Sequence, residues 1–175
     1  MVNAVWGNIF GSPREKKVII ETLGQLPAFE GLSKNDLAQV ERVTHERRYK
    51  AGEPVFDEKM PGAGMYIVLS GEVVIEKLIG DDNKIELATV GEKCFFGELA
   101  LIDEMPRSAG ARAKIDSVLL AFCKPDLENL LEHNPGLAAR IVRNVAKMIC
   151  RRLVETNNRM EALETRISTL SHKEK

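Results

Sequence analysis

The segment FFGELALIDEMPRSAG, residues 95–110, carries residue types at a spacing that suits the binding of an anion. Gly97 permits a close backbone approach to a ligand, and Arg107 offers a planar fork of N–H donors that fits phosphate oxygens. Ser108 adds a hydroxyl donor. If residues 98–101 form a short helical turn, their free N–H groups point outward and attract an anion.

Glu98 is unexpected in a phosphate site, because two anions repel each other. A carboxylate only accepts hydrogen bonds, so Glu98 fits a ligand that carries hydroxyl groups as well as a phosphate. A nucleotide whose phosphate lies close to its ribose 2′-OH is the simplest such ligand. The alternative is that Glu98 and Arg107 pair with each other and merely tie a loop, as ion pairs often do. Gly97, Ser108 and the short apolar run favour the anion site.

The chain before this segment begins with helices. Ser12-Pro13-Arg14-Glu15 has the S-x-x-E capping-box pattern, with proline at the first helical position. Ser33-Lys34-Asn35-Asp36 is a second start signal of the same kind, and apolar residues follow both at helical spacing. Residues 1–30 are therefore predicted to form an N-terminal helical segment.

Residues 47–123 are predicted to form many short strands. Turns that contain glycine separate runs such as MYIVLS, EVVIEKL and KIELATV, which are rich in β-branched residues. The run SVLLAF, residues 117–122, is predicted to be a buried closing strand. Many short strands at this spacing are typical of a barrel or sandwich, and they make up most of a domain predicted over residues 31–145.

The last part of the chain is predicted to be helical. Pro125 opens one helix and Asn134-Pro135 opens a longer one. From Ala146 the apolar positions follow spacings of three and four, the a/d pattern of a coiled coil. Ala146 and Ile149 are expected to pack on the chain's own domain. The later seam positions need a partner helix, so residues 146–175 are predicted to be a dimerisation helix; these positions are Leu153, Thr156, Met160, Leu163, Ile167 and Leu170.

Composition argues against several classes of function. The formal net charge is −1, whereas a domain that binds nucleic acid is usually basic. Three scattered cysteines and isolated histidines indicate neither a disulfide framework nor a metal site. No signal peptide and no membrane span is recognised. We therefore expect a cytoplasmic protein that is not an enzyme and has no metal, no cofactor, and no nucleic-acid or membrane partner.

The residues Phe96–Ile102 and Pro106–Ala109, three positions apart, resemble the phosphate-binding cassette of the cyclic nucleotide-binding domain family, roughly F-G-E-L-A-L-[LI]-x-x-x-P-R-x-A. Members of this family include bacterial cyclic-AMP receptor proteins and the regulatory subunits of cyclic-AMP-dependent kinase. The resemblance covers about residues 27–165. It implies an α+β fold, an eight-stranded, jelly-roll-like β-roll flanked by helices, to which the predicted coiled-coil helix is appended.

The resemblance also implies roles for single residues. Glu98 would accept the ribose 2′-OH, and Arg107 would pair with a phosphate oxygen. Backbone N–H groups near Leu99 and Ala100 would complete the phosphate cradle. In the bacterial receptors the residue matching Ser108 contacts phosphate, whereas in cyclic-GMP kinases a hydroxyl there reads guanine. The ligand is therefore expected to be cyclic AMP, with cyclic GMP left open.

Thr156 and Asn157 match positions whose side chains reach the purine in the bacterial receptor. A second interpretation is that Thr156 sets the register of the coiled coil, and both stay open. The sequence thus predicts a cyclic nucleotide sensor that forms a homodimer, lacks a DNA-binding domain and signals through an unknown partner. The alternative is a degenerate, ligand-free dimerisation module of the same fold. An enzyme acting on cyclic nucleotides is a third hypothesis, which no metal-ligand set or general base in the sequence supports.

Overall fold

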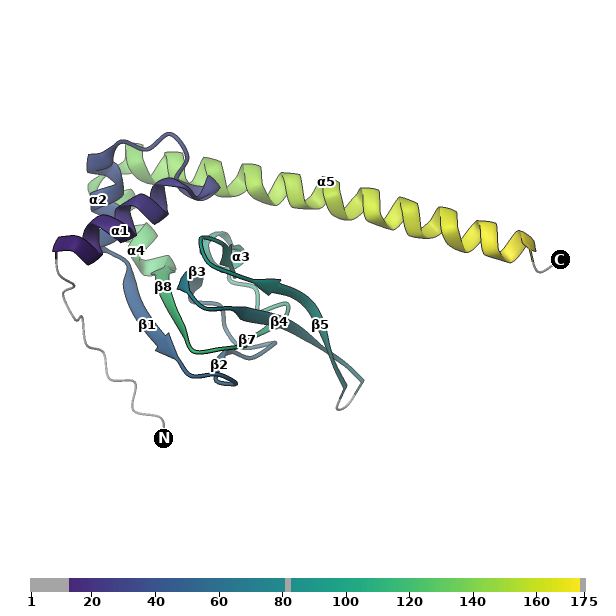
Figure 1. Cartoon of the computed structure of the whole chain (residues 1–175). Helices are drawn as coiled ribbons and strands as arrows, with labels where there is room; N and C mark the ends of the chain where they lie inside the picture. The colour runs from purple at the N-terminus through teal and green to yellow at the C-terminus, as the bar shows by residue number, and fades with distance from the viewer. Residues whose placement is uncertain (1–12, 81–82, 174–175) are drawn as a thin grey trace.

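Eight strands form the centre of the computed structural model, which describes residues 13–80 and 83–173 (Figure 1). The strands are β1 (His45–Tyr49), β2 (Pro54–Phe56), β3 (Gly64–Ser70), β4 (Val73–Ile79), β5 (Asn83–Val90), β6 (Phe95–Phe96), β7 (Gly110–Ala113) and β8 (Ser117–Cys123). The helices are α1 (Pro13–Gly24), α2 (Lys34–Arg42), α3 (Leu99–Ile102), α4 (Lys124–His133) and α5 (Pro135–Lys173), with a 3₁₀ turn, η1 (Pro27–Phe29). The eight-stranded roll flanked by helices and followed by a long C-terminal helix is confirmed.

The strands pair antiparallel in two four-stranded sheets, ordered β1-β8-β3-β6 and β2-β7-β4-β5. The run MYIVLS is apolar on both faces because β3 is covered on both sides. Met65 and Ile67 point to a cluster shared with the helices, whereas Val68 points to a second cluster between the sheets. This alternation follows from the two-residue period of a strand.

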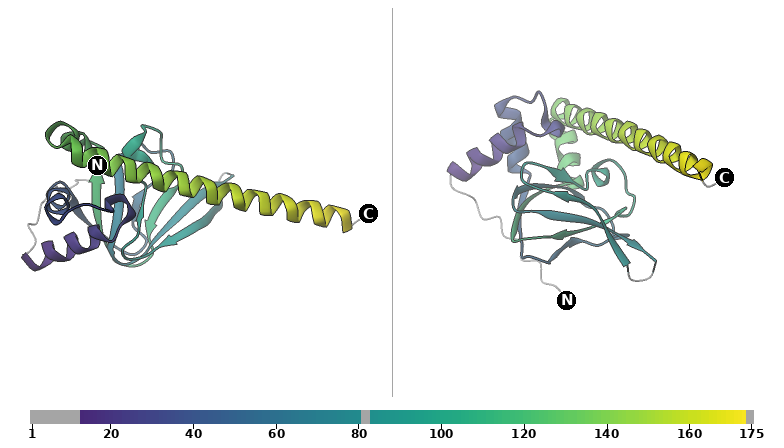
Figure 2. Two further views of the ribbon diagram at one scale, coloured as in Figure 1. Left: turned by 90° about the horizontal axis from the view of Figure 1, so that it is seen from above. Right: turned by 45° about the vertical axis from the view of Figure 1, so that its right-hand side comes forward.

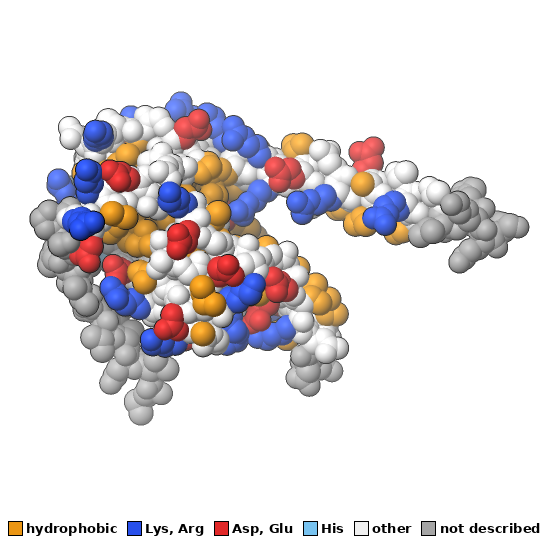
Figure 3. All heavy atoms as spheres, viewed as in Figure 1, with side chains coloured by type: hydrophobic (Ala, Val, Ile, Leu, Met, Phe, Trp, Pro, Cys, Tyr) orange, Lys and Arg blue, Asp and Glu red, His pale blue; other side chains and the backbone are white. Residues whose placement is uncertain are grey.

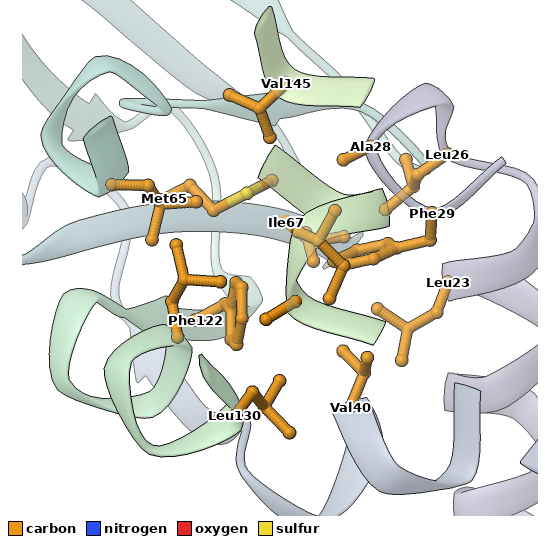
Figure 4. Close-up of a cluster of buried hydrophobic side chains, with 14 of the residues drawn as sticks. Leu23, Leu26, Ala28, Phe29, Val40, Met65, Ile67, Phe122, Leu130 and Val145 are labelled. Carbon is orange, nitrogen blue, oxygen red and sulfur yellow. The ribbon is translucent and has the colours of Figure 1, made fainter. Parts of the chain in front are cut away.

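One core joins the helices to the roll (Figure 4). Phe29 of η1 meets Phe122 of β8 edge-on, with ring centroids 6.1 Å apart. Leu23 and Leu26 pack in the same cluster and are at most 1% exposed. The first helices are therefore held by the same apolar burial that holds the sheet. Asn144 of α5 adds a polar tie, because its Nδ2 donates to the backbone carbonyl of Glu30 at 2.9 Å.

The predicted start of α2 is confirmed in detail. Ser33 Oγ accepts the backbone N–H of Asp36 at 3.2 Å, and the backbone N–H of Ser33 donates to Asp36 Oδ2 at 3.0 Å. This reciprocal pair is a capping box. The predicted cap at Ser12 lies outside the described residues.

Helix α5 begins at the predicted position and runs along the roll before it projects beyond the strands (Figure 2). Asn134 Oδ1 accepts the backbone N–H of Leu137 at 3.2 Å and caps the helix start. Val145 and Ile149 pack on the core, as expected for Ile149, but Ala146 is exposed. The expectation for Ala146 is wrong, because each residue turns a helix by about 100° and Val145 already faces the core.

Candidate functional site

The segment that follows β6 turns sharply into α3. Gly97 adopts φ +74°, in the left-handed region that favours glycine. A Cβ at this position would lie 2.6 Å from Arg107 Nη1, so only glycine leaves room for the guanidinium. Glu98 is the residue before the single helical turn of α3, as the sequence predicted for a turn over residues 98–101.

The backbone of Arg107 is fixed on both sides by the loop that precedes β3. Its N–H donates to the carbonyl of Met60 at 2.8 Å, and its carbonyl accepts the N–H of Lys59 at 2.8 Å. The guanidinium is fixed as well, because Nη1 donates to the carbonyl of Gly97 at 3.0 Å and Nη2 to that of Gly64 at 2.8 Å. The charged group is thus held in one orientation before any ligand arrives.

The guanidinium of Arg107 is buried and incompletely satisfied. Its side chain stacks over the ring of Phe56, 3.9 Å from the ring centroid, and the residue is 7% exposed. Burial lowers the pKa of Arg107, chiefly through desolvation, although nearby groups that include Tyr66 and Glu98 oppose the change. In the described part of the chain, Arg107 Nε is the one buried side-chain nitrogen or oxygen with no hydrogen-bond partner. A buried donor without an acceptor is costly, and it suits an acceptor supplied by a ligand.

The carboxylate of Glu98 is buried and pairs with α5. The residue is 3% exposed, and its Oε1 accepts a hydrogen bond from Arg152 Nη1. The guanidinium of Arg152 also lies over the ring of Phe95, 5.3 Å from its centroid. The alternative in which Glu98 and Arg107 pair with each other is therefore not what the structure contains.

A cavity of about 670 Å³ lies between this segment and α5. That volume is within the range usual for small-molecule sites. The predicted site residues that line it are Gly97, Glu98, Leu99, Ala100, Arg107, Ser108 and Thr156. The walls opposite α3 are apolar and come from β4, β5 and β6; their residues include Ile75, Ala88, Val90, Phe95 and Phe96.

Three predicted residues do not simply line the cavity with a free hydrogen-bond donor. Asn157 is exposed and does not line the cavity of its own chain. The N–H of Ala100 already donates to the carbonyl of Gly97 at 3.3 Å, so it is not a free donor in this structure. Ser108 is exposed at the cavity wall, and its carbonyl accepts the ammonium of Lys77 at 3.1 Å.

Sequence reasoning did not assign several cavity residues to the site, among them Phe56, Arg152, Glu155 and Arg159. Phe56 comes from a strand far from the cassette in sequence, and no local spacing points to it. Arg152, Glu155 and Arg159 belong to the helix face that also carries Thr156. Residues three and four apart share a helix face, so this relation to Thr156 is the signal that could have found Arg152 and Arg159.

Two findings concern other classes of function. Among residues 13–80 and 83–173, no three His, Cys, Asp or Glu side chains are grouped as a metal site requires. No helix in the same ranges combines the length and the apolar character needed to cross a bilayer.

The eight-stranded roll thus carries a buried arginine and a buried glutamate at the wall of one cavity. The sequence profile of the cyclic nucleotide-binding domain family matches residues 46–134, from β1 to the end of α4. The chain belongs to the cyclic nucleotide-binding domain family.

Similar proteins differ in what surrounds this domain. The cyclic AMP receptor protein of Thermus thermophilus is 32% identical over 78% of this chain and 62% of that protein. Glutaminase 1 of Bradyrhizobium diazoefficiens is 32% identical over 81% of this chain and 22% of that protein. The crystal structure of the Thermus thermophilus catabolite activator protein superposes with a TM-score of 0.71 at 31% identity, over 79% of this chain and 63% of that one. The chain thus spans less than two thirds of the length of these relatives.

Proposed function

We propose that this protein binds cyclic AMP in the cavity between α3 and α5 and that it acts as a sensor that signals through a partner protein. The name of the Thermus thermophilus relative supports cyclic AMP as the ligand. The role is one of binding, with no catalytic step and no cofactor. A cytoplasmic location belongs to the proposal and is supported by Cys94, Cys123 and Cys150, which are free thiols in the structure.

The observation that carries the proposal is the unpartnered Nε of Arg107. The two Nη groups are already committed to backbone carbonyls, whereas the Nε–H is buried at a cavity with nothing to donate to. A cyclic phosphate would accept from this Nε–H and from the second N–H of a neighbouring Nη, which is the bidentate geometry that arginine favours. The Glu98 carboxylate would then accept the ribose 2′-OH.

The hydroxyl of Thr156 supports adenine over guanine. Thr156 Oγ1 donates its proton to the backbone carbonyl of Arg152 at 2.8 Å, so its lone pairs are left to accept. Adenine presents an amino donor at N6, where guanine presents the acceptor O6. Cyclic GMP is therefore proposed to bind less tightly than cyclic AMP.

The second half of α5 supports a homodimer. Leu153, Met160, Leu163 and Ile167 form a seam in which each side chain is more than half exposed, and Figure 3 shows hydrophobic side chains at intervals along the projecting helix. The side chain of Leu170 lies outside the described residues. An exposed a/d seam is typical of a coiled coil that lacks its partner strand, and we propose a parallel pair of α5 helices. In such a pair Asn157 would approach the cavity of the second chain.

The seam alone would also fit a structural dimerisation module without a ligand. That alternative leaves the orphaned Arg107 Nε and the buried Glu98 carboxylate without a purpose, and we do not favour it.

Calorimetric titration of the protein with cyclic AMP, cyclic GMP and 5′-AMP side by side tests the binding proposal. We expect one cyclic AMP per chain, weaker cyclic GMP binding and much weaker 5′-AMP binding, because an open phosphate carries an extra charge and no longer lies beside the 2′-OH. Absence of heat with both cyclic nucleotides would favour the ligand-free module.

Light scattering tests the dimer. Leu163→Asp places a charge in the seam and should give a monomer. Thr165→Asp, which adds the same charge elsewhere on the exposed helix, should leave the dimer intact. A wild-type chain that stays monomeric at high concentration contradicts the coiled-coil interpretation.

A further inference from the structure

We propose that a row of three exposed cations on α5, hereafter the basic stripe, is the docking surface for an acidic helix of a partner protein. The stripe consists of Arg143, Lys147 and Arg151. The inference rests on the proposed signalling role, because it gives the partner protein a surface and a chemistry. Residues four apart lie on one face of a helix, and at 1.5 Å per residue the stripe extends about 12 Å along α5.

The charge of α5 is distributed unevenly along its length. Residues 135–154 contain five lysines or arginines and no aspartate or glutamate. The two cations outside the stripe have partners: Arg140 Nη2 lies 3.0 Å from Asp36 Oδ2, and Arg152 donates to Glu98. Among the residues that the structure describes, no hydrogen bond or ion pair joins a stripe side chain to another residue. The stripe is therefore positive charge that the fold leaves unneutralised.

The stability of the helix does not account for the stripe. Like charges four residues apart repel each other and weaken a helix slightly. Cations favour a helix in its last turn, whereas Arg151 lies far before the end of α5 at Lys173. The helix would be at least as stable with neutral residues at these three positions.

The basic stripe lies away from the core, the cavity and the exposed seam. Met160 of the seam stands nine residues after Arg151, and at about 100° per residue the two side chains leave the helix on opposite sides. None of the three stripe residues lines the cavity. Figure 3 shows Lys and Arg side chains gathered along the upper edge of the molecule, over the first half of α5. A parallel pair of α5 helices would thus carry one stripe on each outer side, free for another molecule.

The spacing of the stripe matches that of an acidic helix. Its cations follow one another at steps of about 6 Å, and every fourth residue of a second helix recurs at the same step. Such a helix can lie alongside α5 and place one carboxylate opposite each cation. Arginine suits this partner, because its planar fork can bind a carboxylate through two N–H groups. Val154, three residues beyond Arg151 and 58% exposed, offers the same helix an apolar contact.

Nucleic acids and membranes fit this surface less well. A nucleic acid continues as a polyanion beyond three charges, but Glu161 stands five full turns after Arg143 on the same face of α5, and the net charge of the chain is −1. A helix that binds a bilayer surface inserts an apolar face. Beside the stripe the exposed residues Ala146 and Cys150 are small, and the apolar side of this part of α5 packs on the core.

The test measures the binding of a capped, alanine-rich peptide of about 20 residues, long enough to be helical, with glutamate at every fourth or third position. An isomeric peptide with glutamate at every second position spreads the same charge around the helix and should bind less tightly. The stripe variant carries Arg143→Gln, Lys147→Gln and Arg151→Gln together. One surface ion pair contributes up to about fivefold in affinity, so the stripe variant should bind the matched peptide about tenfold more weakly than wild type.

A second triple variant is the matched control. Arg14→Gln, Lys17→Gln and Arg48→Gln together remove three exposed cations from α1 and β1 and change the net charge by the same amount. This variant should bind the matched peptide as wild type does. Binding to wild type should disappear at an ionic strength of about 1 M, where charges are screened beyond about 3 Å. The stripe variant should resist urea at least as well as wild type, because the like charges no longer repel.

Several results would overturn the inference. If the matched peptide fails to bind wild type at low salt, the stripe does not recognise an acidic helix. Equal binding of the two peptides, or an equal loss in the control variant, would mean that only net charge matters. Tighter binding of a short DNA duplex, or of vesicles with equal parts of phosphatidylserine and phosphatidylcholine, that is lost in the stripe variant would assign the surface to nucleic acid or membrane. A large loss of stability in the stripe variant would make the stripe a structural feature.

The peptide measurement needs no nucleotide, which keeps it separate from the proposed function. The stripe variant should bind cyclic AMP as wild type does, because no residue of the cavity is changed. If the wild-type chain binds the matched peptide and neither cyclic nucleotide, the nucleotide proposal alone fails. If it binds cyclic AMP and does not bind the peptide, the present inference alone fails.

Discussion

Arg107→Ala should weaken cyclic nucleotide binding far more than it weakens the fold. The guanidinium donates to the carbonyls of Gly97 and Gly64, stacks on Phe56, and leaves its buried Nε–H for a phosphate. Removing two charge-assisted bonds to phosphate should cost about 2–4 kcal/mol, or about 30- to 700-fold in affinity. Measuring both its loss of affinity and its loss of stability distinguishes the contacts to the ligand from the contacts within the protein.

The same change also removes contacts within the protein. Two hydrogen bonds to backbone carbonyls and one ring contact together contribute about 2–4 kcal/mol, against a typical free energy of unfolding of about 5–15 kcal/mol. Urea unfolding of Arg107→Ala should therefore show a lower midpoint and a folded protein in buffer. Calorimetry on that folded protein then gives the loss of affinity.

Arg112→Ala is the matched control for Arg107→Ala. Arg112 is on β7, donates to the carbonyl of Gly52 at 2.6 Å, lies 3.4 Å from the carboxylate of Glu76, and does not line the cavity. It should lower stability to a smaller degree and leave affinity unchanged. Arg107→Ala that binds cyclic AMP as tightly as wild type would refute the role of Arg107, and an equal loss in Arg112→Ala would show that the effect is one of stability.

Two further predictions concern backbone features. Gly97→Ala should lower the free energy of unfolding by about 1–2 kcal/mol because of its positive φ. It should also weaken cyclic AMP binding, because its Cβ would lie 2.6 Å from the buried guanidinium of Arg107. Gly31→Ala has the same φ of +74° with open space around it, so urea unfolding should show a similar loss of stability and calorimetry should show unchanged binding. Ser33→Ala should cost about 1 kcal/mol at pH 7. The Ser33 hydroxyl is the largest cause that holds the pKa of Asp36 below its ordinary 3.8. A depressed carboxyl pKa stabilises the fold above the ordinary value and loses that effect as pH falls through the lowered value, so the deficit of Ser33→Ala should shrink when unfolding is measured in acid; a deficit independent of pH would contradict this assignment.

Local chemistry allowed part of the site to be predicted. Gly97, Glu98 and Arg107 lie on a continuous segment, so their spacing alone indicates a glycine turn, a carboxylate and a charged fork near one ligand. The Ser33 capping box could also be predicted from the sequence, because all its hydrogen bonds lie within four residues. Their positions in the structure agree with what short-range geometry requires.

The remaining features depend on how distant elements pack. Arg152 meets Glu98 only because α5 crosses the mouth of the roll, and no local pattern encodes that crossing. The heptad pattern extended to Ala146, but Val145 is the residue that packs in the core. The rotation of α5 is fixed by the apolar contacts of its earlier turns. Phe56 joins the cavity through the pairing of β2 with β7. Each case depends on a tertiary contact that the local sequence does not specify.

The Nε–H of Arg107 offers the most direct test of the central claim. Its nuclear magnetic resonance signal, assigned by its loss in Arg107→Lys, reports whether this buried donor gains an acceptor. When cyclic AMP is added to the wild-type chain, we expect the signal to move downfield and its exchange with water to slow, as for a new hydrogen bond to phosphate. Cyclic AMP that binds without changing this signal would contradict the account.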